Sequence, residues 1–76
     1  MLAKLMGIQT VDFTNNNGER VSGTTIFCAF NDEKVDGLRT EKFFLKEGIK
    51  LPECKLNDMI DISFNMKGKV EMVNKA

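Results

Sequence analysis

The chain has 76 residues with 11 basic and 11 acidic side chains, so its formal net charge is zero. This length fits one domain, which we take as residues 1–76. The absence of histidine excludes Ser-His-Asp and Cys-His catalysis within this chain, and two cysteines cannot build a four-thiolate zinc site. We therefore expect no enzyme, no metal and no cofactor.

No apolar run approaches the roughly 20 residues of a membrane span, and residues 1–7 lack the long apolar segment of a signal peptide. We expect a soluble protein of the cytoplasm that does not contact membranes. In that compartment Cys28 and Cys54 are expected to be reduced thiols.

The first two predicted strands cover residues 2–13 and 20–30, and the Asn/Gly run at 15–18 between them is typical of a hairpin turn. Strict alternation in the first strand places Leu5 and Gly7 on one face. The second half of the second strand is apolar on both faces. This pattern predicts a further contact layer, and a second copy of the chain is its simplest supplier, so we expect a homodimer.

The third predicted strand covers residues 38–46, and residues 47–57 are expected to form an ordered loop because Pro52 would interrupt a helix. Residues 59–66 and 69–73 predict a final pair of strands joined as a hairpin. Five strands joined by Asn/Gly turns predict an all-β domain. Closure into a barrel removes exposed strand edges, so we expect an OB-like barrel, with an SH3-like barrel as the alternative.

Side-chain alternation also predicts which residues are buried. Phe43 and Leu45 share one face of the third strand and are expected in the core, together with Cys28. Methionine is a common gap filler in protein cores. Three methionines are expected to play this part: Met59, Met66 and Met72.

A basic and aromatic stripe occupies one face of the third predicted strand. Lys42, Phe44 and Lys46 alternate there about 7 Å apart, near the spacing of phosphates in a stretched single strand. A phenylalanine between two lysines can stack a base while its neighbours meet phosphates. The same pattern has a second interpretation, in which the lysines protect an edge strand from aggregation and Phe44 is core.

Further candidate contacts extend this stripe. Arg20 and Arg39 lie near the ends of the paired strands, and Lys67 and Lys69 flank the last predicted turn. Phe27 is a second candidate stacking platform. We expect these basic side chains to neutralise phosphates of a nucleic acid.

Three segments carry a resemblance to a known family: residues 23–30 (GTTIFCAF), 41–45 (EKFFL) and 64–70 (FNMKGKV). With this layout the chain resembles small OB-fold single-stranded-DNA-binding proteins of phages and mobile elements, of the gene V-like type. The resemblance implies a homodimer that binds single strands through strand aromatics and basic side chains. It implies a role for the Lys42-Phe44-Lys46 face and for the turn at Arg20, and a bacterial or phage-infected cell as the location.

Two functions are compatible with these residues. The basic and aromatic stripe favours a non-enzymatic module that binds single-stranded DNA or RNA. The net charge of zero favours a small β-barrel interaction module that docks on a host or phage protein through an apolar sheet face.

Overall fold

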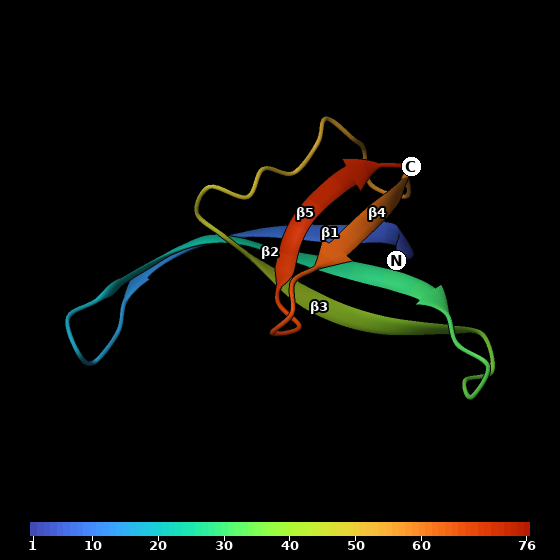
Figure 1. Cartoon of the computed structure of the whole chain (residues 1–76), viewed down its shortest axis with the longest axis horizontal. Helices are drawn as coiled ribbons and strands as arrows, with labels where there is room; N and C mark the ends of the chain where they lie inside the picture. Colours follow the sequence, from blue (N-terminus) through green and yellow to red (C-terminus); the bar gives the residue numbers. More distant parts are fainter.

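The computed structural model describes residues 1–76, which form one antiparallel sheet of five strands and no helix (Figure 1). The strands are β1 (Leu2–Thr14), β2 (Arg20–Asn31), β3 (Leu38–Lys46), β4 (Met59–Phe64) and β5 (Val70–Lys75). The all-β class is confirmed, and each expected strand forms within a few residues of its expected bounds. No helix in the structure is long and apolar enough to span a membrane.

The strands lie in the order β3-β2-β1-β4-β5, and the sheet is not closed. β3 and β5 are therefore the two edge strands. They contact each other at one place but share no hydrogen-bonded ladder. The type of barrel that the sequence predicts is thus not established by this sheet, although its two edges come together.

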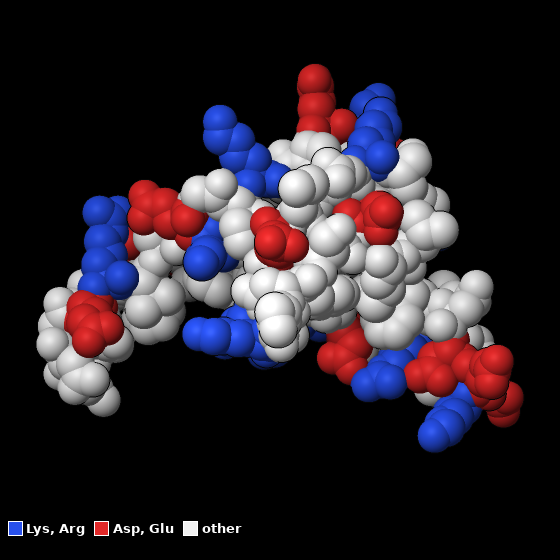
Figure 2. Space-filling view, viewed as in Figure 1, with Lys and Arg blue, Asp and Glu red and all other residues white.

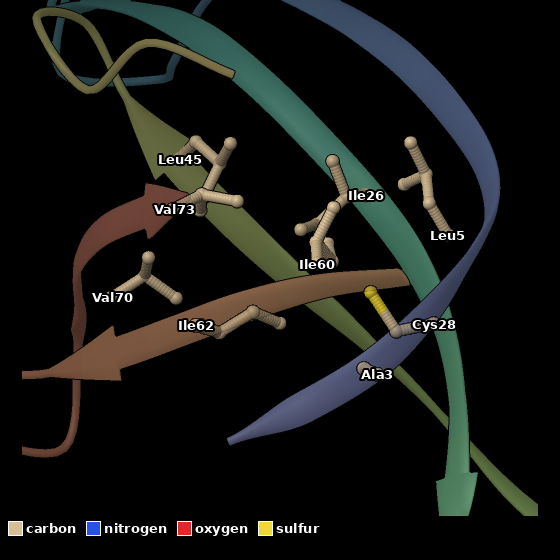
Figure 3. Close-up of a cluster of buried hydrophobic side chains, with 9 residues drawn as sticks. All are labelled: Ala3, Leu5, Ile26, Cys28, Leu45, Ile60, Ile62, Val70 and Val73. Carbon is tan, nitrogen blue, oxygen red and sulfur yellow. The ribbon is translucent and has the colours of Figure 1, made fainter. Parts of the chain in front are cut away.

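The core lies between two layers, because the β4–β5 hairpin folds back across the three longer strands (Figure 1). Buried apolar side chains from all five strands converge there (Figure 3). They are Ala3, Leu5, Ile26, Cys28, Leu45, Ile60, Ile62, Val70 and Val73. Phe43 packs against this cluster and is partly buried. The expected core positions of Phe43, Leu45 and Cys28 are confirmed. We call the face of β1–β3 that meets the hairpin the core face, and the opposite one the outer face.

A bulge at Met6 interrupts the alternation of β1. Leu5 pairs with Cys28 and Gly7 pairs with Phe27, so Met6 has no partner of its own. Leu5 is buried, whereas Gly7 lies on the outer face beside Phe27. The expectation that Leu5 and Gly7 share a face is wrong, because the extra residue between them turns the following positions over.

The three methionines expected in the core are exposed, with Met66 fully so at 105%. Met59 and Met72 each precede a buried residue of their strand, Ile60 and Val73, so alternation points the methionines outward. Met66 lies beyond the end of β4, in the turn. The expectation is wrong because branched aliphatic side chains already fill the core.

β1 and β2 extend well beyond the rest of the sheet as a projecting hairpin (Figure 1). We call residues 11–23 the wing. β3 pairs with β2 only from Gly23 onward, and β4 pairs with β1 only over residues 2–4. The wing is therefore a two-stranded ribbon with two open faces, and on its outer face Phe13 is 54% exposed.

Candidate nucleic-acid interface

A groove of about 850 Å³ lies at the free edge of β3, where the β4–β5 turn approaches it. β3 contributes Phe44 and Lys46, and the hairpin contributes Lys67 and Lys69. Four of the contact residues predicted from the sequence therefore line one groove. Phe64 also lines it, and its ring packs edge-on against Phe43 with centroids 5.6 Å apart. This contact fixes the β4–β5 hairpin, which forms one side of the groove, against the core face of β3.

The groove has a local excess of positive charge. Its charged side chains are Lys46, Lys67, Lys69 and one acid, Glu71. None of these four takes part in an ion pair; the cations of all four ion pairs in the structure are arginines or the N-terminal amine. The lysine ammonium groups of the groove are consequently free to meet an anionic ligand.

The β4–β5 turn is held by Asn65 rather than by its lysines. The Asn65 side-chain oxygen accepts hydrogen bonds from the backbone N–H groups of Lys67 (2.9 Å) and Lys69 (3.1 Å). The backbone N–H of Gly68 donates to the Asn65 carbonyl at 3.0 Å, and that of Asn65 donates to the Lys69 carbonyl at 2.8 Å. These backbone donors are already satisfied. The lysine side chains are therefore the charged groups that this turn offers to an anion.

The wing ends in a turn of the same construction. The Asn15 side-chain oxygen accepts from the N–H groups of Asn17 (2.9 Å) and Glu19 (3.0 Å), and the N–H of Gly18 donates to the Asn15 carbonyl at 3.1 Å. The N–H of Asn15 donates to the Glu19 carbonyl at 2.8 Å, and Gly18 has a φ of 79°, against 77° for Gly68. The two turns differ in charge: Asn17 and Glu19 occupy the places that lysines hold in the groove turn. The backbone therefore does not demand lysines in such a turn.

The remaining stripe residues lie beside the groove, on the outer face of the sheet. Phe27 and Lys42 are cross-strand partners and line a smaller hollow of about 300 Å³ with Thr40 and Glu41. Phe44 pairs with Thr25, which shares the face of Phe27 by strand alternation. Phe27 and Phe44 are 39% and 43% exposed. Phe44 is therefore a surface residue, and the interpretation that it belongs to the core is wrong.

The two arginines lie outside the groove and are engaged with acids. Arg20 donates two hydrogen bonds to the Asp12 carboxylate, both 3.0 Å long, within the wing. Arg39 donates to Asp32 at 3.0 Å and to Glu41 at 2.7 Å, and its guanidinium lies 6.0 Å from the centroid of the Phe30 ring. The pKa of each guanidinium is raised, chiefly by the hydrogen bond to Asp12 for Arg20 and to Asp32 for Arg39.

Acidic side chains gather at the end of the molecule that carries the connection between β2 and β3, at the lower right of Figure 2. Asp32, Glu33 and Asp36 lie in this connection with a single lysine, Lys34. The pKa of Asp32 is lowered, first by the hydrogen bond from the Lys34 backbone N–H and then by Arg39. The acids of the β2–β3 connection are therefore separated in sequence from the lysines that line the groove.

Metal binding and thiol reactivity are the other chemistries that these residue types allow. No three Asp, Glu or Cys side chains gather in a way that could hold a metal ion. Cys28 and Cys54 are free thiols, and burial raises the pKa of the Cys28 thiol to about 11. A thiol that holds its proton this tightly is a poor nucleophile at neutral pH.

Phe64, Asn65 and Met66 were missed as groove residues because alternation in the fourth strand places Phe64 and Met66 in the core. The signal that could have placed them is the repeat of the Asn-x-x-Gly pattern at 15–18 and 65–68, which marks two equivalent turns. No protein-family model, curated protein or solved structure matches this chain significantly.

Proposed function

We propose that this chain is a non-enzymatic module that binds single-stranded DNA or RNA in the groove beside β3. Lys46, Lys67 and Lys69 hold phosphates, and Phe44 stacks a base. The observation that carries the proposal is the convergence of three unpaired lysines and an exposed phenylalanine from separate parts of the chain on one groove. The smaller hollow with Phe27 and Lys42 continues the interface along β3.

The strand order supports an OB-like assignment. In a five-stranded OB barrel the face of the second and third strands and the turns after the first and fourth strands form the ligand site. Here the stripe lies on β2 and β3, and the lysine turn follows β4. The contact between the edge strands β3 and β5 is where such a barrel would close.

The ligand class follows from the kind of contact. A base stacks on an exposed ring only if its face is free, which favours a single strand over a duplex. The interface offers lysines and phenylalanines rather than paired hydrogen-bond donors and acceptors. We therefore expect binding with little sequence preference, in DNA and RNA alike.

Fluorescence anisotropy with labelled oligo-dT over a salt series tests the proposal. If Lys42, Lys46, Lys67 and Lys69 each meet a phosphate, log K should fall against log salt with a slope of about −2.8, or about −0.7 per contact. Lys46→Ala should make the slope shallower by about 0.7. The control Lys34→Ala, in the acidic connection, should leave the slope unchanged. Absence of binding at low salt, or equal effects of both variants, would refute the proposal.

The wing favours a second candidate, protein–protein contact, with a second copy of this chain as the partner. The part of its outer face not covered by the Phe44 ring consists of Val11, Phe13 and Val21, none of them charged, whereas the Asp12–Arg20 ion pair lies on the other face. A two-stranded hairpin is marginally stable alone. Two copies stacked about a two-fold axis would cover both apolar faces without like-charge repulsion.

A further inference from the structure

Each of the two exposed phenylalanines of the proposed interface packs against a glycine of the neighbouring strand: Phe27 against Gly7 and Phe44 against Gly23. A Cβ atom placed at Gly23 would lie 2.6 Å from Cζ of Phe44 and 2.4 Å from the carbonyl oxygen of Leu45. A Cβ atom placed at Gly7 would lie 3.3 Å from Cδ2 of Phe27. At both positions a larger side chain would compete with the ring for the same space.

Backbone dihedral angles do not require glycine at these two positions, although at Gly23 the carbonyl oxygen of Leu45 by itself excludes a Cβ atom. The glycines with positive φ are Gly18, Gly37, Gly48 and Gly68, all outside the strands. Gly7 and Gly23 lie within β1 and β2 and have ordinary strand conformations. What distinguishes Gly7 is the space above its backbone, which the Phe27 ring occupies. At Gly23 the Phe44 ring and the Leu45 carbonyl oxygen occupy that space together.

Core packing does not explain these glycines either. Both rings lie on the outer face and remain 39% and 43% exposed. Glycine inside a strand weakens the sheet, and an aromatic ring folded over it recovers part of that stability. A β-branched residue at position 7 would suit the strand itself better. The arrangement instead holds the two aromatic rings close to the backbone of the sheet, with part of each ring exposed to solvent.

We propose that Gly7 and Gly23 are positioning residues that hold the rings of Phe27 and Phe44 down on the outer face as two platforms for bases. This inference rests on the proposed nucleic-acid function. Phe27 and Phe44 are diagonal neighbours on β2 and β3, a relation that separates residues by about 7–8 Å. Successive stacked bases in a duplex are about 3.4 Å apart. The platforms therefore take bases that have separated from each other, which selects an extended single strand.

Gly7→Val tests the inference, because valine favours a strand and its methyl groups would take the place of the Phe27 ring. The control Gln9→Val introduces the same side chain on the same face of β1, opposite Thr25. Gly7→Val should weaken oligo-dT binding as much as Phe27→Ala does, about 5- to 150-fold for one stacked base, with the salt slope unchanged. The double variant Gly7→Val/Phe27→Ala should bind no more weakly than Phe27→Ala alone. Gln9→Val should bind like the parent protein.

A measurement without nucleic acid separates this inference from the proposed function. The ring of Phe27 should shift the α-proton resonances of Gly7 upfield, and Phe27→Ala should remove that shift. Thermal melts of every variant exclude unfolding as the cause of weaker binding. Gly7 resonances unaffected by Phe27→Ala, or normal binding by Gly7→Val where Phe27→Ala binds weakly, would overturn the positioning role while leaving the groove proposal intact. Equal weakening by Gly7→Val and Gln9→Val would overturn it as well.

Discussion

The two equivalent turns permit an exchange that changes where charge lies and nothing else. The variant Asn17→Lys, Glu19→Lys, Lys67→Asn, Lys69→Glu gives each turn the other's residues at its third and fifth positions. Its amino-acid composition and its net charge of zero are those of the parent chain. Both turns are closed by an asparagine side chain and backbone hydrogen bonds, so the exchange leaves those bonds in place.

The expected loss follows from two phosphate contacts. Each contact with a single strand contributes about 0.7 to the slope of log K against log salt, so the slope should become shallower by about 1.4. If the variant and the parent converge near 1 M salt, where ion release contributes nothing, their affinities at 0.1 M should differ by about 25-fold. The glutamate brought to position 69 would repel phosphates and enlarge this difference.

Anisotropy titrations with labelled oligo-dT at several salt concentrations measure both quantities, and thermal melts verify that the exchanged chain folds. The exchange separates local from global electrostatics, because the total charge is constant. Equal affinity and equal slope for the two proteins would refute the assignment of Lys67 and Lys69 to the interface.

The remaining predictions concern the wing and the buried thiol. Val11→Lys, on the outer face of the wing, should dissociate the proposed dimer in sedimentation equilibrium at micromolar concentration, whereas Thr10→Lys, one residue earlier on the opposite face, should not. A parent protein that stays monomeric on concentration would contradict the dimer. Burial raises the pKa of the Cys28 thiol from 9.0 to about 11, so the native state keeps a proton that the unfolded chain releases, and the free energy of unfolding should fall between pH 9 and pH 11. Urea unfolding of Cys28→Val should lack that part of the fall, and an identical pH dependence in both proteins would disprove the coupling.

The sequence predicts the strands well because each is a local pattern bounded by Asn or Gly turns. The prediction of which face a side chain occupies fails where an extra residue shifts the alternation of a strand. At Met6 the bulge reverses the faces of the rest of β1, and no feature of residues 5–7 announces it. A second irregularity lies opposite Ser63 and Phe64, where Glu71 is an extra residue in β5, so that Val70 and Val73 are both buried although they are three positions apart. Positions beyond such points are assigned to the wrong face by strict alternation, as the expected sharing of a face by Leu5 and Gly7 illustrates.

The stripe on β3 could be predicted because its three members lie on one strand. Its joining to the β4–β5 turn could not, since that depends on how the hairpin folds back across the longer strands. The partners of Arg20 and Arg39 were equally out of reach. Asp12 faces Arg20 only through the β1–β2 register, and Asp32 meets Arg39 only through the path of the β2–β3 connection.

The net charge of zero is a poor guide to how the groove would interact with a polyanion, because the charges are unevenly distributed over the molecule. The structure is 42 Å long, about four Debye lengths at 0.1 M salt. The wing and the acidic β2–β3 connection lie toward its two ends, with the β4–β5 turn between them (Figure 1). At that ionic strength the groove lysines are largely screened from the acids at the ends, so contacts within the groove would decide the affinity of the proposed complex. The neutral total would reduce long-range attraction and so limit the rate of encounter more than the stability of that complex.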